Sequence, residues 1–431
     1  MEALVLAGGK GERLRPITET RPKPLVPILC RPLLGWIVES LKKIGIRRMV
    51  VVASYMEDQI RDFARGVSGA EVEVVSQGVE LGSGDAVLKG LHAVRDDEVL
   101  IVYGDIFLKN FENAFRRVAE AEGPAMAAVP VDDPSKYGVL KISGGKLVKI
   151  VEKPDSPPSN VINAGIYKLA VSDIESSRDV GVSPRGEIEF TDIVNRIASA
   201  KPLQVVELEK GSWIDIGYPW NLIEANKMAL ELIESTVLGT IEEPVKIKGK
   251  VYVGEGALIR SFTYVEGPAY IGDRASIGPS ARIRPYSVIC DGASIGFSVE
   301  VKESLIFEGA KINHLAYVGD SIVCEHANLG AGTITANLRL DEGEIFMKIR
   351  DARISTGRKK FGAVIGAHVK TGVNVSFMPG VKVGSHSAIA AGLVIDDDVP
   401  PGKFVRNVNG KALLEDMPIR KSARLIKRRE W

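Results

Sequence analysis

Short apolar runs alternate with helical patterns through the first half of the chain. Four runs, "EALVLA", "RMVVVAS", "EVEVVSQ" and "VLIVYGD", predict buried strands. Strands separated by helices in this order favour a mostly parallel sheet covered on both faces. Ligands of such sheets bind beyond the carboxyl ends of the strands, where "LVLAGG" and "VYGD" lie. Apolar residues at helical spacing between the runs are Leu34, Ile37, Leu41 and Ile44, and then Val87, Leu91 and Val94.

The second half of the chain has a six-residue period. An aliphatic residue recurs at this step and is commonly followed by glycine and then by a small residue. A short period sustained over so many repeats predicts a β-solenoid, in which each turn stacks its apolar residue on the previous one. A charged segment at 335–362 interrupts the period, and such insertions map to loops on one face. The series is Ile247, Val253, Ile259, Val265, Ile271, Ile277, Ile283, Ile289, Ile295, Val301, Ile306, Ile312, Val318, Val323 and Leu329, resuming at Ile365, Thr371, Phe377, Val383, Ile389 and Ile395.

The two periods divide the chain of 431 residues, which is too long for one core of ordinary size. Residues 1–225 are predicted to form the α/β domain and residues 245–405 the solenoid. The join, "YPWNLIEANKMALELIES", predicts a helix, and a linker helix is assigned to 226–244. Residues 406–431 are predicted to be a basic, solvated tail containing "RKSARLIKRREW".

Charge and hydropathy exclude several classes of protein. The 56 basic side chains nearly balance the 55 acidic ones, so a nucleic-acid partner is not indicated. No apolar run approaches the roughly 20 residues that span a bilayer, and no signal peptide precedes the first strand. We therefore expect a soluble, cytoplasmic protein with neither a membrane nor a nucleic acid as partner.

The first strand leads into a glycine loop, "LAGGKGERLRP". Its glycines, Gly8, Gly9 and Gly11, do not fit the dinucleotide or the Walker motif, and an isolated loop of this kind is often only a tight turn. Arg13 and Lys23 lie close by in the sequence. A backbone free of side chains and flanked by fixed cations suits a triphosphate.

This stretch resembles the signature of sugar-1-phosphate nucleotidylyltransferases, G-G-x-G-x-R-L-x-P followed by P-K-P. The resemblance continues in order through about 225 residues. "QGVELGSGDAV" is similar to the family's base and sugar loop. The matching residues are Gly8, Gly9, Gly11, Arg13, Lys23, Gln77, Gly82, Asp105 in "YGD", Gly138 in "KYGVL", Glu152 and Lys153 in "EKP", Asn163 in "NAG", and Asp215 in "WIDIG".

The resemblance implies that a sugar-1-phosphate oxygen attacks the α-phosphorus of a nucleoside triphosphate and that pyrophosphate leaves. Such a step needs charge neutralisation and alignment more than a protein base. By resemblance, Asp105 and Asp215 would hold Mg²⁺, and Arg13 and Lys23 would carry the phosphates. The sugar phosphate would meet Lys153, and the sugar would meet Glu152 and Asn163.

The solenoid carries a second motif, "KINHLAYVGDSIVCEHANLGAGTITANLR". It resembles the acetyltransferase half of the bifunctional enzymes that make UDP-N-acetylglucosamine. His314 matches the general base of that family, a role that suits imidazole because its ordinary pKa is about 6.5. Asn337 matches the residue that holds the acceptor amine, and the backbone N–H of Ala331 matches the group that faces the oxygen of acetyl-CoA's thioester. The amino-sugar phosphate site is matched by Arg284, Lys302, Tyr317, Asn328 and Lys360.

The resemblance, closest to archaeal bifunctional members, implies a Rossmann-like nucleotidyltransferase domain followed by a left-handed parallel β-helix that assembles as a homotrimer. The choice between UTP and dTTP and the sugar epimer stay open, because three features depart from the bacterial bifunctional enzyme. Asp215 replaces its asparagine, Ser83 replaces a common threonine, and the R-L-x-P ending of the glycine loop is more similar to hexose-1-phosphate nucleotidyltransferases. Two alternatives also remain: a nucleotidyltransferase with a regulatory or assembly solenoid, and a regulatory subunit without activity.

Overall fold

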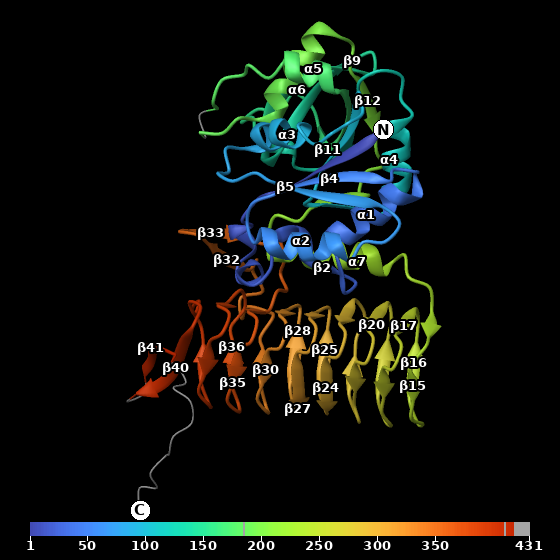
Figure 1. The fold of residues 1–431 in the computed structure, drawn as a ribbon. Coiled ribbons are helices and arrows are strands. Elements are labelled where there is room, and N and C mark those ends of the chain that lie inside the picture. Colours follow the sequence, from blue (N-terminus) through green and yellow to red (C-terminus); the bar gives the residue numbers. More distant parts are fainter. Residues whose placement is uncertain (184–185, 409–410, 418–431) are drawn as a thin grey trace, which may run out of the picture. The chain divides into compact units, whose positions relative to one another are not determined.

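The computed structural model describes residues 1–183, 186–408 and 411–417. The chain divides into two compact units, Met1–Ile233 and Glu234–Trp431, which run from blue to green and from yellow to red in Figure 1. Every helix in the described ranges is too short or too polar to cross a membrane.

Unit 1 is built on a nine-stranded mixed sheet with the order β5-β4-β1-β6-β11-β8-β12-β10-β9. The four strands expected from the hydrophobic pattern are present and run parallel as neighbours: β1 (Glu2–Ala7), β4 (Arg48–Ala53), β5 (Glu71–Ser76) and β6 (Glu98–Tyr103). The expected burial is wrong for β5, which lies at the edge of the sheet and alternates exposed and half-buried residues along most of its length. The other half of the sheet is mainly antiparallel, which the sequence did not predict. Its strands are β8 (Ala125–Pro130), β9 (Gly138–Ser143), β10 (Lys146–Glu152), β11 (Val161–Ala170) and β12 (Gln204–Glu207).

Helices cover both faces of this sheet. On one face α3 and α6 pack through Val87, Leu91 and Phe190 against Leu4, Val52 and the other sheet residues of one buried cluster. On the other face α4 packs against β8, β11 and α1. The helices are α1 (Leu33–Lys43), α2 (Glu57–Arg65), α3 (Ser83–Leu91), α4 (Phe111–Ala119), α5 (Val171–Ser176), α6 (Phe190–Ala200) and α7 (Pro219–Leu230). Four short strands complete the unit: β2 (Pro27–Ile28), β3 (Arg31–Pro32), β7 (Ile106–Leu108) and β13 (Trp213–Asp215).

Unit 2 consists of three parallel sheets of very short strands, consistent with a left-handed β-helix. Each coil contributes one strand to each sheet, so Val253 pairs with Ile271 and Ile271 with Ile289 in the next coils. Sheet 1 comprises β14 (Thr236–Val237), β17 (Val251–Val253), β20 (Ala269–Ile271), β23 (Ser287–Ile289), β26 (Leu305–Ile306), β29 (Ile322–Val323), β34 (Val364–Ile365) and β37 (Lys382–Val383).

The remaining strands of unit 2 belong to sheets 2 and 3 and to one hairpin. Sheet 2 comprises β15 (Thr240–Ile241), β18 (Leu258–Ile259), β21 (Ser276–Ile277), β24 (Ser294–Phe297), β27 (Lys311–His314), β30 (Asn328–Leu329), β35 (Lys370–Thr371), β38 (Ala388–Ile389), β40 (Lys403–Val408) and β41 (Lys411–Asp416). Sheet 3 comprises β16 (Lys246–Lys248), β19 (Tyr264–Glu266), β22 (Arg282–Ile283), β25 (Glu300–Lys302), β28 (Tyr317–Gly319), β31 (Ile334–Thr335), β36 (Ser376–Phe377) and β39 (Val394–Ile395). The charged insertion forms a hairpin of β32 (Phe346–Ile349) and β33 (Ala352–Ser355).

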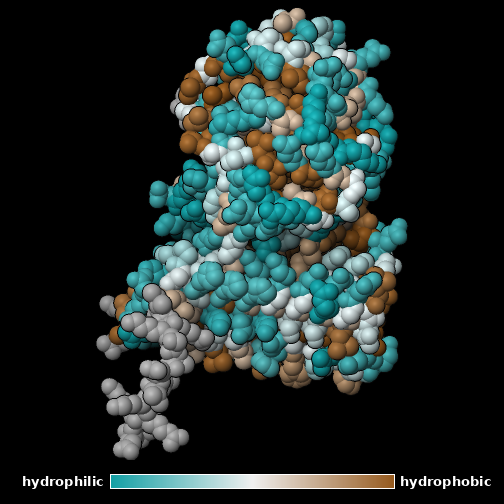
Figure 2. Space-filling model, in the orientation of Figure 1, coloured by the Kyte–Doolittle hydropathy of each residue, from teal (hydrophilic) through white to brown (hydrophobic). Residues whose placement is uncertain are grey.

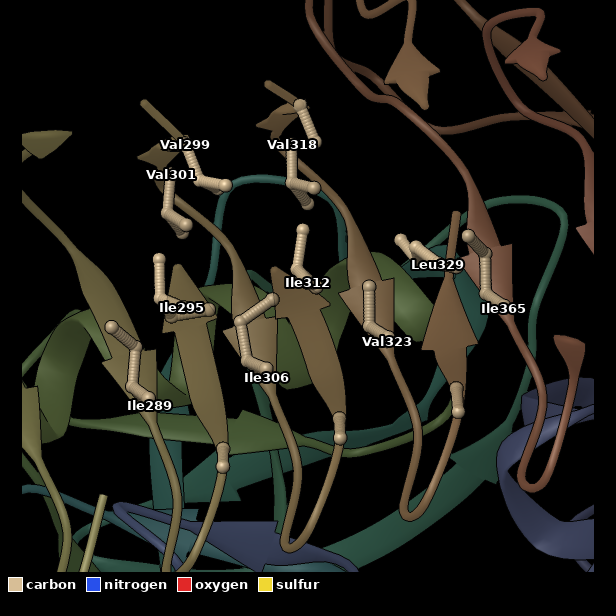
Figure 3. Close-up of a cluster of buried hydrophobic side chains, with 14 of the residues drawn as sticks. Ile289, Ile295, Val299, Val301, Ile306, Ile312, Val318, Val323, Leu329 and Ile365 are labelled. Carbon is tan, nitrogen blue, oxygen red and sulfur yellow. The ribbon is translucent and has the colours of Figure 1, made fainter. Parts of the chain in front are cut away.

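Most residues of the six-residue period form the core of the β-helix, the exceptions being Ile247 and Thr371, which are only partly buried. Ile289, Ile306 and Val323 lie above one another in sheet 1, and Ile295 and Ile312 do so in sheet 2, all pointing inward (Figure 3). Hydrophilic and hydrophobic side chains mix on the visible outer face of the unit (Figure 2). The burial of these residues confirms the solenoid that the sequence pattern predicts. Such short strands are stabilised mainly by burying an aliphatic residue against the next coil.

Two predicted boundaries differ from the structure. The helix assigned to 226–244 is α7, which ends at Leu230 and packs within unit 1, where the amide of Asn226 accepts a hydrogen bond from Leu29 N at 2.8 Å. Residues from Thr236 onward already form the first coil of the β-helix by pairing with β17. The predicted tail also begins too early, since β40 and β41 pair as a hairpin with Val405 buried in the core. The basic residues 418–431 lie outside the described residues.

Candidate active sites

A cleft crosses unit 1 beyond the carboxyl ends of β1 and β6. It consists of two adjoining cavities of about 360 and 350 Å³, both of which Tyr103 and Asp105 line. The first contains four of the residues expected to bind the nucleotide: Gly8, Gly9, Gln77 and Gly82. The second contains residues expected on the sugar and metal side, Gly138, Glu152, Lys153, Asn163 and Asp215, together with Arg13, which was expected to carry the phosphates. The structure thus brings these residues together around one cleft. Gly11 and Lys23 do not line either cavity, but Lys23 contacts Asp105, which lines both.

The glycine loop is packed directly against Lys23. Gly11 has a φ of 63°, and a Cβ there would lie 2.9 Å from Thr18 Cγ2 and 3.3 Å from Lys23 Cβ. The Thr18 hydroxyl donates a hydrogen bond to Gly11 O at 2.8 Å. Only glycine satisfies both the left-handed backbone and the close contact at this position.

Lys23 lies between the two aspartates expected to hold a metal. Its Nζ is 2.6 Å from Asp105 Oδ2 and 3.5 Å from Asp215 Oδ1. The two carboxylates converge because β13 pairs with β7, and Ile216 N donates to Asp105 O at 2.9 Å. Burial, together with the nearby charge of Asp105, raises the pKa of Asp215 even though Lys23 opposes that shift. Burial by itself would lower the pKa of Lys23, but Asp105 and Asp215 raise it above its ordinary value.

Arg13 is held by Tyr218, a residue that the sequence analysis did not single out. Arg13 Nη1 donates to Tyr218 Oη at 3.4 Å, and the guanidinium lies 4.9 Å from the centre of the tyrosine ring. Burial alone would lower the pKa of Arg13, yet Tyr218 and Asp215 raise it. Tyr218 directly follows the matched "WIDIG", so its position in the sequence was the available signal.

The sugar side of the cleft is narrow at Gly138, where a Cβ would lie 3.0 Å from Glu152 Oε2. Asn163 Oδ1 accepts a hydrogen bond from Gly165 N at 2.9 Å, which orients its amide. Further lining residues were not assigned to the site by the sequence analysis. Tyr103, Tyr137 and Trp213 lie inside the quoted motifs, whereas Glu187, Glu189 and Thr191 lie outside every motif.

In unit 2 three predicted residues on or next to sheet 3, Lys302, Tyr317 and Asn337, gather around a buried carboxylate, Asp320, which the sequence analysis missed. Lys302 Nζ lies 2.8 Å from each carboxylate oxygen of Asp320. The amide of Asn337 donates to Asp320 Oδ2 and also to Tyr317 Oη, the latter at 3.1 Å. Burial, and next the charge of Asp320, raises the pKa of Tyr317. Asp320 lies in the quoted motif "AYVGDS", but only the structure shows that it joins these three side chains.

Ion pairs extend this site along the neighbouring coils. Arg284 Nη1 lies 2.9 Å from Glu300 Oε1, and Arg358 pairs with Glu303. Arg358 belongs to the segment after the hairpin, and its Nε donates to Lys360 O at 3.1 Å. The side chain of Lys360 is exposed. The position of its backbone is fixed by the hydrogen bond from Arg358 and not by a strand of sheet 3.

The other predicted residues lie on sheet 2 and on the turn that follows it. His314 ends β27 with its side chain exposed, three residues before Tyr317. Its carbonyl oxygen accepts a hydrogen bond from Gly332 N at 3.2 Å, so the turn containing Ala331 stacks on the turn of His314. Asn328 pairs with Lys311 in β27 and is exposed. His314 and Asn337 thus lie on neighbouring coils, at opposite ends of the paired parallel strands β28 and β31: His314 precedes β28 and Asn337 follows β31.

Known proteins resemble the chain over both units. Residues 2–231 match the family described as "Nucleotidyl transferase", and residues 265–376 match the "GMPPB C-terminal domain". The chain is 48% identical over 415 residues to a "Bifunctional sugar-1-phosphate nucleotidylyltransferase/acetyltransferase" of Sulfurisphaera tokodaii, with 94% of this chain and 100% of that relative aligned.

Two methanogen proteins called "Bifunctional protein GlmU" are similar over the same share of the chain. The relative from Methanococcus maripaludis is 44% identical over 408 residues and that from Methanocaldococcus jannaschii 40% over 406, each covering 94% of this chain and 97% of the relative. Similarity of this extent includes the nucleotidyltransferase unit and the β-helix together. The chain therefore belongs to the family of bifunctional sugar-1-phosphate nucleotidylyltransferases/acetyltransferases, of the archaeal GlmU-like type.

Proposed function

We propose that the β-helix acetylates an amino-sugar-1-phosphate, glucosamine-1-phosphate or an epimer, with acetyl-CoA. Unit 1 then transfers a uridylyl or thymidylyl group from UTP or dTTP to the acetylated sugar-1-phosphate. The observation that carries the proposal is that each unit holds its own set of the expected residues: the cleft around Asp105 and Asp215 in unit 1, and the Lys302, Asn337 and Tyr317 group in unit 2.

For nucleotidyl transfer, an oxygen of the sugar phosphate attacks the α-phosphorus, the new P–O bond forms, and the bond to pyrophosphate breaks. No protein base is needed, because the attacking phosphate oxygen is already ionised. Arg13 and Lys23 are the cations available to the triphosphate, and the Gly8 to Gly11 backbone lets it approach. Lys153 lines the sugar side, where it would neutralise the attacking phosphate.

The chemistry of Asp105 and Asp215 fits a magnesium ion. Two neighbouring carboxylates favour a shared cation, and burial, followed by the charge of Asp105, raises the pKa of Asp215 although Lys23 opposes the shift. Mg²⁺ is usually held by one or two carboxylates and by substrate phosphates, so a third protein ligand is not required. Among the described residues no group of three or more His, Cys, Asp or Glu side chains is arranged for a metal. When bound, the ion would neutralise charge on the transferred phosphate.

For acetyl transfer, the amine of the sugar attacks the thioester carbon, a C–N bond forms, and the C–S bond to coenzyme A breaks. His314 would take the proton that the amine loses. Asn337 would receive the amine, since its NH₂ group is already directed to Asp320 and Tyr317 and its carbonyl oxygen is left to accept. Arg284 and Lys302 would meet the sugar phosphate, with Asn328 and Lys360, and the Ala331 N–H would meet the thioester oxygen.

A homotrimer with acetyltransferase sites between neighbouring subunits is part of the proposal. Exposed apolar side chains near His314 support it: Phe297 pairs with His314 in the adjacent coil, and Leu315 follows it. Leu315 is 60% exposed, which favours cover by another subunit. A monomer in light scattering would contradict the shared site. Location in the cytoplasm stays a prediction from the sequence.

The test is an assay of the purified protein with glucosamine-1-phosphate and acetyl-CoA, followed by UTP or dTTP and Mg²⁺. Release of the coenzyme A thiol and then of pyrophosphate is expected. Pyrophosphate release from ready-made N-acetylglucosamine-1-phosphate, without any thiol release from the amino sugar or its epimers, would instead favour a nucleotidyltransferase with a regulatory β-helix. Absence of both activities would favour the regulatory subunit.

A further inference from the structure

The amide of Gln77 has a fixed orientation at the floor of the nucleotide side of the cleft. Its Nε2 lies 3.0 Å from Gly82 O and 3.0 Å from Asp85 Oδ2. A peptide carbonyl and an ion-paired carboxylate are both acceptors only, so the NH₂ group must face them. Because Gln77 is only 4% exposed, turning the amide over would place its carbonyl oxygen against two other oxygens without water to intervene.

The carboxylate that holds this amide is itself held by Lys89. Asp85 and Lys89 are one turn apart on α3, and Lys89 Nζ lies 2.9 Å from Asp85 Oδ2. The same ammonium donates to the backbone oxygen of Gln77 at 2.5 Å. Asp85 is 8% exposed. One cation therefore fixes both the carboxylate and the backbone of the residue that the carboxylate orients.

With its NH₂ group committed, Gln77 presents its carbonyl oxygen toward Gly8. A Cβ at Gly8 would lie 2.5 Å from Gln77 Oε1, and both residues line the 360 Å³ cavity. No hydrogen bond to Oε1 is found within the described part of the chain. A ligand in this cavity therefore meets an acceptor here and not a donor.

We propose that Asp85 and Lys89 are positioning residues that set the nucleobase selectivity of unit 1 by holding Gln77 as an acceptor. The selected class is bases with a ring N–H, namely uracil and thymine at N3 and guanine at N1. In cytosine and adenine the corresponding ring nitrogen is itself an acceptor and would face Oε1 lone pair to lone pair. This inference rests on the proposed nucleotidyl transfer in unit 1 and concerns only which base that site takes.

The test is Asp85→Asn, an isosteric change that keeps the packing but can offer Gln77 either an oxygen or an NH₂ group. The Gln77 amide can then turn over. The ratio of kcat/KM for UTP over that for CTP, measured with one sugar-1-phosphate, is expected to fall at least about tenfold, the range of one mispaired buried polar group. The change is expected in KM for the nucleotide rather than in kcat, because neither residue touches the phosphates.

Lys89→Met is the second variant, since it leaves Asp85 in place but removes the cation that fixes it, and a smaller fall in the same ratio is expected. Asp173→Asn is the matched control. Asp173 is a buried partner of Lys201 at 2.5 Å on α5, away from the cleft lining, so its substitution should leave the ratio unchanged. An unchanged ratio in both Asp85→Asn and Lys89→Met would overturn the inference. If instead the unmutated protein releases pyrophosphate from none of the nucleoside triphosphates tested, the proposed function is refuted.

Discussion

Asp320→Asn tests whether a buried carboxylate organises the acetyltransferase site. Asp320 has a φ of 49°, in the left-handed region that asparagine tolerates as well as aspartate, so the substitution removes charge without adding backbone strain. The partners that lose an anionic acceptor are Lys302, at 2.8 Å from both oxygens, and Arg358, at 3.7 Å. Asn337 also loses the carboxylate that fixes the orientation of its amide in the unmutated protein.

The size of the effect follows from burial. The side chains of Lys302 and Asp320 are 16% and 1% exposed, so water cannot replace the lost charge. Breaking a buried ion pair from one side costs about 3–5 kcal/mol. Glu303 remains 3.6 Å from Lys302 Nζ and offsets part of this cost, which places the expected loss near the lower end, about 3 kcal/mol. For a domain of this size that corresponds to a fall in Tm of about 6–12 °C.

Activity should fall as well, because Lys302 and Asn337 would no longer be held in one geometry. Misplacement of substrate-positioning groups by about 1 Å can cost about 10²-fold in rate, which is the expected loss of acetyl transfer. Nucleotidyl transfer from N-acetylglucosamine-1-phosphate should be unchanged, since unit 1 keeps its own site.

The measurements are thiol release at saturating acetyl-CoA and the Tm of unit 2 by calorimetry. Asp398→Asn is the matched control, because Asp398 pairs with Lys382 at 3.2 Å within unit 2 but away from the candidate site. If Asp320→Asn lowers the Tm and leaves acetyl transfer at the rate of the control, Asp320 stabilises the fold without positioning the site. If neither quantity changes, the buried ion pair contributes nothing measurable and the reasoning fails.

Three further predictions concern the two sites separately. His314→Ala should lower acetyl transfer about 10²- to 10⁴-fold, the usual loss of a general base, and leave nucleotidyl transfer intact; acetylation at nearly the original rate would make His314 a structural turn residue. Asp105→Asn should abolish pyrophosphate release while acetyl transfer persists, and retained Mg²⁺-dependent release would refute the metal assignment. Because the pKa of Asp215 is raised in the folded protein, the folded state binds more protons than the unfolded state between the two pKa values, so the stability of unit 1 should fall as pH rises above about 4. Asp215→Asn should remove that component, and a difference in Tm between the two proteins that stays constant with pH would contradict it.

Local patterns in the sequence determined the parts of the fold that depend on burial along one strand or helix. The runs that became β1, β4 and β6 are mainly apolar because both faces of these strands are covered, whereas β5 at the sheet edge carries exposed glutamates at alternate positions. The six-residue period in the sequence corresponds to a stack of buried aliphatic residues in the structure, because each coil repeats the same environment. The resemblance to a known family supplied the candidate site residues, and the structure gathers most of those in unit 1 around one cleft.

Tertiary structure alone decided which charges meet. Asp215 reaches Asp105 only because β13 pairs with β7, and the carboxylate of Asp320 meets Lys302 and Asn337 only because three coils stack in register. The orientation of the Gln77 amide likewise depends on Asp85 and Lys89, whose turn of α3 has no sequence signal of a role. A hydrophobic period is a property of neighbours in the chain, whereas the state of a buried charge or amide depends on groups that long-range pairing brings within hydrogen-bond distance.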